Sequence, residues 1–340
     1  MDIIRKVHRL CSCCMQEHDV WVVRDVAKNI YKEQLVEYSA TYEYCELADE
    51  YLVPEELITA NDIAMKNAYR EANGLLTTEQ IVAIRKKYNI SQSDLANLLG
   101  WGGKTITRYE GHQVQDVAHD TILRKIDSDP EWYLTILQER KKSFAEVTYA
   151  KYYRLAVKAY EETQDAYLRK SIFARYARYD DADCNGGRCL DIEKLIDVMR
   201  YYSNSNKVSV LYKVKMMKML WYADALAYKR YNSSITGLVY TALPMGAVPV
   251  AHGLIMDLKG ISYEEIEYED NTAYHFKSDN SNQYPTLTDT DRVVLDTIID
   301  VCGGDTRDQI VKRMHGERAY KETKANEVIL FKYAKELSID

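Results

Sequence analysis

The sequence contains no apolar run near the roughly 18–20 residues that a membrane-spanning helix needs. Residues 1–6 also lack the apolar core of a signal peptide. An excess of basic residues is missing too, since 45 Lys and Arg stand against 52 Asp and Glu, a net charge of −7. We therefore expect a cytoplasmic protein that has no membrane partner and does not coat nucleic acid by bulk charge.

Phenylalanine is scarce, with 4 residues, whereas tyrosine is abundant, with 29. Tyrosine combines an apolar ring with a polar tip, which suits half-buried faces and interfaces. Cysteine is present in an odd number, at Cys11, Cys13, Cys14, Cys45, Cys184, Cys189 and Cys302. In a chain without an export signal, this usage indicates a reducing compartment, in which clustered thiols more often bind metal than form disulfides.

Length and composition indicate more than one domain. At 340 residues and 46% hydrophobic content, the chain can bury two or three cores. We expect a mainly α protein with a small β part, of the α+β class. Four segments are predicted: an N-terminal sheet region (1–74), a helix-turn-helix domain (75–135), a helical connector (136–183) and a C-terminal domain (184–340).

Local patterns support this division. β-branched and polar residues alternate in residues 20–26 and 35–44, which predicts a small antiparallel sheet. Pro54 is expected to begin a helix. Residues 131–179 contain neither proline nor glycine, so long helices are predicted there. Residues 180–187 have turn chemistry throughout and predict a linker.

Three short helices are predicted within residues 75–112. Thr78 is expected to cap the first helix. Ser91 is expected to cap the second, with Asp94 as its reciprocal acidic partner. The third covers residues 104–110 and follows glycines that permit a sharp turn. This is the arrangement of a helix-turn-helix.

The third helix has the features of a DNA-recognition helix. Ile106 and Tyr109 are expected to face the core, which leaves polar side chains outside. Arg108 would pair with a guanine edge, whereas a merely solvated Arg108 is the alternative. The residues predicted to contact DNA are Gln92, Ser93, Lys104, Thr105, Thr107 and Arg108. The 75–112 segment carries 5 basic and 3 acidic residues, so specific binding is expected to need a homodimer on two half-sites.

The N-terminal cysteines form half of a zinc knuckle. Cys11 and Cys14 have C-x-x-C spacing, and Cys45 follows about 30 residues later, but Ala48 stands where its partner would be. Two interpretations are open. Either Cys11, Cys14 and Cys45 bind structural zinc with a fourth ligand, or the sheet is metal-free. The fourth-ligand candidates are Cys13, His18 and Asp49. A metal-free sheet would be held by Trp21, Val23, Leu35 and Val36.

Both features resemble MqsA-family antitoxins. The resemblance rests on the segments 84–87, 91–96 and 100–111, the last reading Gly-Trp-Gly-Gly-Lys-Thr-Ile-Thr-Arg-Tyr-Glu-Gly. It implies an Xre-type helix-turn-helix in which Arg108 lies on the recognition helix. It also implies a zinc-bearing sheet ahead of it, although the family pattern has both cysteine pairs and this chain does not.

The C-terminal segment predicts a second globular domain. Amphipathic helices are expected over residues 190–200 and 208–231, followed by a short β-rich part within residues 235–249. Asp224 lies in an apolar helix near Tyr222 and Tyr228, so we expect a buried, hydrogen-bonded structural acid. The methionines of this helix are expected to pack in the core, with an adaptable binding surface as the alternative.

This segment resembles the Panacea domain. The motif residues are Trp221, Tyr222, Asp224, Tyr231, Gly237, Gly246 and Pro249, and Ala247 stands where proline is usual. The resemblance implies a toxin-neutralising domain, often fused to a DNA-binding module. Some relatives resemble adaptors that deliver a toxin to a cellular protease.

The acidic stretch 263–270 is expected to form a solvated edge strand. If it binds the toxin, Glu264, Glu265 and Glu267 are the candidates, because they would attract a basic partner. The toxin-binding residues are otherwise unknown. His252, His275 and His315 lie in no catalytic or metal motif, so no enzymatic activity is expected.

Together these features predict a bacterial or phage type II antitoxin. It would neutralise a co-encoded toxin through residues 184–340 and repress its own promoter through the helix-turn-helix. The alternative is a transcriptional repressor whose C-terminal domain senses a partner or ligand, without any toxin.

Overall fold

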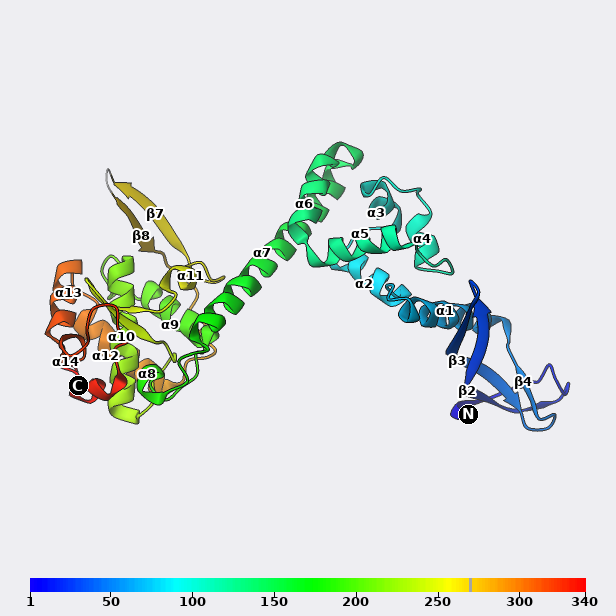
Figure 1. The fold of residues 1–340 in the computed structure, drawn as a ribbon, viewed down its shortest axis with the longest axis horizontal. Coiled ribbons are helices and arrows are strands. Elements are labelled where there is room, and N and C mark those ends of the chain that lie inside the picture. Colours follow the sequence, from blue (N-terminus) through cyan, green and yellow to red (C-terminus); the bar gives the residue numbers. More distant parts are fainter. Residues whose placement is uncertain (269–270) are drawn as a thin grey trace. The chain divides into compact units, whose positions relative to one another are not determined.

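The computed structural model describes residues 1–268 and 271–340, and its fold is mainly α with a small β part, as predicted. The chain divides into two compact units, Met1–Thr163 and Gln164–Asp340. The division falls within the segment predicted as a connector. Figure 1 shows the elements of each unit. Within the described residues, no helix combines the length and apolar character needed to cross a membrane.

The N-terminal sheet has four antiparallel strands in the order β1-β2-β3-β4. They are β1 (Asp2–Leu10), β2 (Glu17–Tyr31), β3 (Gln34–Cys45) and β4 (Glu50–Leu52). Lys32 and Glu33 alone join β2 to β3, both with positive φ (47° and 65°), the backbone of a tight two-residue hairpin turn.

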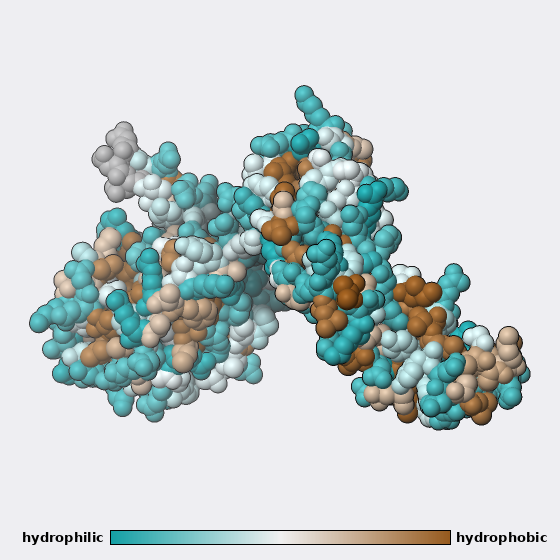
Figure 2. Space-filling view, turned by 45° about the vertical axis from the view of Figure 1, so that its right-hand side comes forward, coloured by the Kyte–Doolittle hydropathy of each residue, from teal (hydrophilic) through white to brown (hydrophobic). Residues whose placement is uncertain are grey.

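The face of this sheet that carries Val23 and Val36 is buried, whereas the opposite face is buried near Val20 and Cys45 and exposed toward the β2–β3 turn. Val23 and Val36 are buried, as expected for residues that hold the sheet, whereas the same expectation for Leu35 is wrong. Successive strand residues point to opposite faces, so Leu35 lies on the exposed part of the opposite face, paired with Ile30. Figure 2 shows hydrophobic residues gathered in patches between hydrophilic ones on the visible face.

Helix α1 (Glu55–Ala72) begins directly after Pro54, as predicted, and packs against β3. The side-chain amide of Asn61 pairs with the backbone of Thr41, accepting from its N–H and donating to its carbonyl at 2.8 Å each. At the other end of α1, the buried Arg70 contacts the helical part of the same unit. The helix therefore connects the sheet to the helices that follow.

The helical part contains α2 (Thr78–Lys87), α3 (Gln92–Leu98), α4 (Thr105–Tyr109), α5 (Val117–Ser128), α6 (Pro130–Glu139) and η1 (Lys141–Ser143). Two capping predictions are wrong. Thr77 caps α2, with Gln80 completing the capping box, because Thr78 already belongs to the helix. Ser91 caps α3 as expected, but the Asp94 carboxylate accepts the Tyr152 hydroxyl at 2.7 Å.

Helix α7 (Glu146–Tyr176) has 31 residues, which confirms a long helix in the stretch without proline and glycine. Short helix α8 (Ala182–Asn185) follows in the predicted linker and ends at Gly186, whose φ is +68°. Such left-handed backbone favours glycine.

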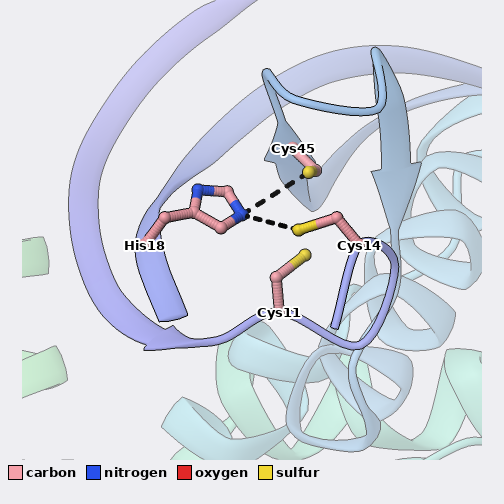
Figure 3. A group of neighbouring side chains, drawn as sticks. All are labelled: Cys11, Cys14, His18 and Cys45. Atoms are coloured by element: carbon pink, nitrogen blue, oxygen red, sulfur yellow. Dashed lines mark hydrogen bonds between the residues drawn. The ribbon is translucent and has the colours of Figure 1, made fainter. Parts of the chain in front are cut away.

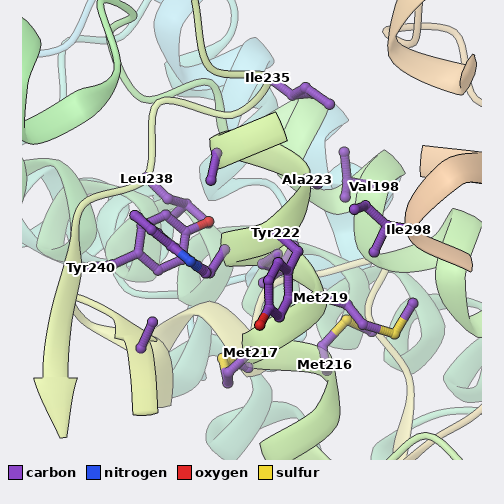
Figure 4. Packing of buried hydrophobic residues seen from close by; sticks show 14 of the residues in the cluster. Val198, Met216, Met217, Met219, Tyr222, Ala223, Ile235, Leu238, Tyr240 and Ile298 are labelled. Carbon is purple, nitrogen blue, oxygen red and sulfur yellow. The ribbon is translucent and has the colours of Figure 1, made fainter. Parts of the chain in front are cut away.

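The second unit is built around α10 (Lys213–Tyr231), in which every residue from 215 to 227 is buried. Helix α10 starts five residues later than predicted. Met216, Met217 and Met219 lie in the core, which confirms the packing interpretation (Figure 4). The elements around α10 are α9 (Ile192–Asn204), β5 (Tyr240–Leu243), β6 (Gly246–Pro249), α11 (His252–Met256), β7 (Tyr263–Tyr268), β8 (Asn271–Phe276), α12 (Asp289–Cys302), α13 (Arg307–Gly316), α14 (Arg318–Lys321) and η2 (Phe331–Glu336).

Candidate functional site

Four potential metal ligands meet at one end of the sheet. The ligand atoms of Cys11, Cys14, His18 and Cys45 all lie within 4.8 Å of one another, and within the described chain this is the one such group of three or more. Figure 3 shows their side chains converging. Cys11 and Cys14 lie in the turn after β1, His18 near the start of β2, and Cys45 at the end of β3.

Of the three candidates for a fourth ligand, the structure brings His18 next to the three cysteines. It lies two residues before Val20 in β2, on the face where Val20 packs with Cys11 and Cys45. The other two candidates are engaged elsewhere. The Cys13 thiol donates to Glu50 at 3.1 Å, and the Asp49 carboxylate accepts the Tyr44 hydroxyl at 2.6 Å.

The geometry of the group fits a tetrahedral zinc ion. The Nε2 atom of His18 lies 3.2 Å from the sulfur of Cys14 and 3.6 Å from that of Cys45. Zn–S and Zn–N bonds of about 2.3 and 2.0 Å require separations of this order between ligand atoms. Nδ1 of His18 lies 2.9 Å from the backbone carbonyl of Asp19. A carbonyl only accepts, so Nδ1 carries the proton and Nε2 keeps the lone pair that a metal needs.

The backbone of the knuckle favours a thiolate at Cys11. The backbone N–H of Cys14, with that of Cys13, lowers the pKa of Cys11 to about 6. Metal binds the thiolate form, so these donors favour binding. Three sulfurs and one imidazole complete a four-ligand set, which is typical of structural zinc.

Helix α4 presents the predicted recognition surface. Ile106 and Tyr109 are buried, as predicted. Lys104, Thr107 and Arg108 are exposed and Thr105 is half-buried. In the described part of the chain, the guanidinium of Arg108 makes no hydrogen bond.

The two residues of α3 that were predicted to contact DNA, Gln92 and Ser93, differ in the hydrogen bonds that their side chains make within the protein. Ser93 is exposed, and its hydroxyl lies 3.1 Å from that of Ser91. Gln92 instead joins α3 to α4, because its amide donates to Glu110 at 2.7 Å and accepts from the Thr107 hydroxyl at 2.9 Å. Arg85 on α2 donates to the same Glu110 at 2.6 and 3.0 Å. This network fixes α4 against α2 and α3.

Arg70 is a positioning residue that the sequence analysis missed. It is fully buried at the end of α1. Its guanidinium donates to the carbonyl of Tyr109 (2.8 Å) at the end of α4, to that of Gln113 (3.0 Å), and to the side chain of Gln115 (3.0 Å). An arginine in the last turn of an amphipathic helix gives no sequence indication of such burial.

In the second unit, Asp224 organises the Panacea-like motif. Its buried carboxylate accepts the backbone N–H groups of Ile235 and Thr236 at 2.8 Å each, the Thr236 hydroxyl, and the Tyr240 hydroxyl at 2.7 Å. Burial raises the pKa of Asp224, while these donors favour its charged form. The expected structural acid is confirmed, although its partners are Thr236 and Tyr240 in place of the neighbouring tyrosines on α10.

The other motif residues surround this centre. Trp221 and Tyr222 are buried on α10, whereas Tyr231, at its end, is half exposed. Gly237 has a φ of +74°, and a Cβ there would lie 2.4 Å from the carbonyl oxygen of Cys189, so only glycine fits. Gly246 and Pro249 bound β6.

The acidic candidates lie on β7, which pairs with β8 in a two-stranded sheet. Glu264, Glu265 and Glu267 are exposed, and Glu264 forms an ion pair with Lys277 at 2.6 Å. Glu269 and Asp270, which complete the acidic stretch, lie outside the described residues.

Comparison with protein families places both parts of the chain. Residues 9–137 match the family model described as the antitoxin component of a bacterial toxin-antitoxin system, MqsA, and residues 216–321 match the model of the SocA-like antitoxin Panacea domain. A search of curated proteins found no match. Both matched families are antitoxin families, which supports an antitoxin role. More particularly, the chain joins an MqsA-like N-terminal region to a C-terminal Panacea domain, the fusion that the motifs predicted.

Proposed function

We propose that this protein is the antitoxin of a type II toxin–antitoxin system. It neutralises a co-encoded protein toxin by direct binding through the Panacea domain, and it represses its own promoter through the helix-turn-helix as a homodimer. It acts in the cytoplasm without catalysing a reaction. A cellular protease is a further partner that the Panacea resemblance suggests.

The observation that carries the proposal is the presence of two antitoxin-family regions in one chain, at residues 9–137 and 216–321. One of them carries a short helix with exposed Lys104, Thr107 and Arg108. Two sets of contacts hold its C-terminal end, from Arg70 to Tyr109 and from Gln92 to Glu110. They support DNA reading, because a recognition helix must be held at a fixed angle.

We propose further that Cys11, Cys14, His18 and Cys45 bind one structural zinc ion. The donor set, the ligand separations and the proton position on His18 support this assignment. Zinc would cross-link β1, β2 and β3 at the end of the sheet where the buried core is small.

Expression in cells tests the toxin part. The reading frame next to this gene is induced alone and together with the full-length chain. The proposal expects growth arrest from the neighbour alone and recovery on co-expression. A harmless neighbour, or arrest that the chain does not relieve, would instead favour a repressor with a sensing C-terminal domain.

Electrophoretic mobility shift with the upstream DNA tests the promoter part. The wild-type chain should shift this fragment, and Arg108→Ala should do so only at a higher protein concentration, while Arg108→Ala still rescues growth. A wild-type chain that does not distinguish upstream DNA from a scrambled fragment would remove autoregulation from the proposal.

A further inference from the structure

A groove crosses one face of the second unit at the start of α10. Two cavities of about 760 and 280 Å³ share the lining residues Lys213, Val214 and Met245, and together we call them the basic groove. The β7–β8 hairpin contributes Tyr268 and Tyr274 to its wall. Met245 and Tyr268, from different elements, are both more than 40% exposed, so apolar side chains border the groove on two sides.

Lys218 lines the smaller cavity and is 1% exposed. In the described chain, no hydrogen bond or ion pair reaches its ammonium, and burial alone lowers the pKa of Lys218 to about 8. A buried charge without a partner destabilises the folded protein. Its presence therefore calls for a reason other than stability.

Two other buried lysines of the same unit show how the fold normally satisfies such a group. Lys215, one turn earlier on α10, donates to the carbonyl of Gly303 at 2.6 Å and to Ser209 at 3.0 Å. Lys194 on α9 forms an ion pair with Asp291 at 2.9 Å. Lys218 alone among these three is left without an acceptor inside the described chain.

The surroundings of Lys218 favour an anion. Lys213 and Arg307 also line the groove, Arg307 in an exposed ion pair with Asp308 at 2.9 Å, and no described lining residue is Asp or Glu. Burial, with the charges of Lys213 and Lys218, lowers the pKa of the neighbouring His252, so this imidazole is neutral at pH 7. The groove is thus cationic although residues 190–340 carry 19 basic and 22 acidic groups.

Gly246 keeps the space around this ammonium open. Its φ is +107°, and a Cβ there would lie 2.6 Å from Cγ of Met314 and 3.0 Å from Cε of Lys218. A side chain at this position would push on the stem of Lys218 as well as strain the backbone. The Panacea-like glycine is therefore part of the wall that holds the lysine.

We propose that the basic groove binds an apolar segment of the toxin, one of whose carboxylates pairs with Lys218; this inference rests on the proposed function. Apolar side chains of the segment fill the space between Met245 and the hairpin tyrosines. Its carboxylate replaces the missing acceptor in a site shielded from water, where a charge-assisted hydrogen bond is strong. Aromatic and methionine side chains are typical of the walls of such interfaces.

The test compares three full-length variants with the wild type, using the product of the neighbouring reading frame as the probe. Lys218→Met keeps the apolar stem and removes the charge. Lys324→Met is the matched control, because Lys324 is exposed and lines neither cavity. Met245→Glu adds a carboxylate at the rim of the groove, where it would repel the toxin carboxylate that is proposed to pair with Lys218.

Calorimetric titration should show the toxin affinity of Lys218→Met reduced roughly 30-fold or more, as expected when one partner of a buried charge pair is removed. Met245→Glu should also weaken binding, and Lys324→Met should leave it within about twofold. The affinity for upstream DNA should not change in any variant, because the helix-turn-helix lies in the other unit.

Wild-type toxin affinity in both Lys218→Met and Met245→Glu would overturn the groove assignment while leaving the antitoxin function intact. If the wild-type chain itself binds no toxin, the proposed antitoxin function is wrong. The assignment of a toxin segment to the basic groove is then wrong as well. If Lys218→Met does not fold, Met245→Glu at the exposed rim still decides the question.

Discussion

The two units of this protein hold their polar centres in different ways. In the first unit, small apolar clusters are supplemented by polar clamps: the Cys11–Cys14–His18–Cys45 group, Arg70, and the Gln92–Glu110 network. In the second unit, α10 is buried over thirteen consecutive residues, and one carboxylate, Asp224, fixes the loop beside it. The first unit therefore depends on several separate polar contacts and on its metal-ligand group, whereas the second combines an extensive core with one central carboxylate.

The largest effect is expected from Asp224→Ala, which leaves four buried donors without an acceptor. Each unsatisfied buried group costs about 1–3 kcal/mol, so the second unit should lose several kcal/mol. Differential scanning calorimetry should show its melting transition lowered or lost. An unchanged transition of the first unit would confirm that the two cores are separate, and a joint loss would contradict it.

A second prediction concerns the metal group. Cys45→Ser should abolish the binding of one zinc per chain and lower the melting temperature of the first unit, because a four-ligand structural site contributes directly to folding. Cys13→Ser is the matched control, since Cys13 is adjacent in sequence but contacts Glu50. Metal analysis of the purified wild type and of both variants measures the zinc content, and thermal unfolding measures the melting temperature. A metal-free wild type would refute the zinc assignment.

Arg108→Ala should weaken operator binding by about 1–3 kcal/mol, or roughly 5- to 150-fold, without lowering the melting temperature, because Arg108 is exposed. Fluorescence anisotropy with labelled upstream DNA gives the affinity. Arg154→Ala, at an exposed arginine of helix α7, serves as the control for general charge loss. A parallel fall in stability and affinity would make Arg108 a structural residue.

Lys218→Met should stabilise the second unit by roughly 3 kcal/mol at pH 7, since the pKa of Lys218 falls from 10.5 to about 8 on folding. Below pH 8 the folded wild type carries the full penalty of the buried charge. Between pH 8 and 10.5 the unfolded chain binds a proton that the folded chain has lost, so wild-type stability rises with pH relative to the variant. Urea unfolding at several pH values measures this difference, which should shrink as the pH increases.

The smallest effect is expected at the acidic strand. Reversing the charges of Glu264, Glu265 and Glu267 should weaken toxin rescue modestly if the strand attracts a basic toxin, mainly through the association rate. Glu264 should contribute least, because Lys277 already neutralises it and lowers its pKa. Rescue assays at graded toxin induction test this, and unchanged rescue would leave the strand as a solvated edge.

Local sequence patterns were sufficient to predict much of the structure of the first unit, but less of that of the second. Helix α4 and its buried Ile106 and Tyr109 could be predicted from helical periodicity and glycine positions. The choice of His18 among the candidates for a fourth ligand could not, because it depends on how β2 pairs with its neighbours. The burial of Lys218 could not be predicted either. A lysine within a run such as Lys213–Lys218 predicts a solvated face, whereas β6 and α13 pack against α10 where Lys218 lies.

The position of Arg70 has a consequence for how the first unit unfolds. This side chain belongs to the helix that packs on the sheet, yet it donates to the carbonyls of Tyr109 at the end of α4 and of Gln113 beyond it. Fraying of α1 would therefore remove the support from the end of α4. The sheet and helices α2–α4 should open as one cooperative block, with amide hydrogens on both sides exchanging at a common rate.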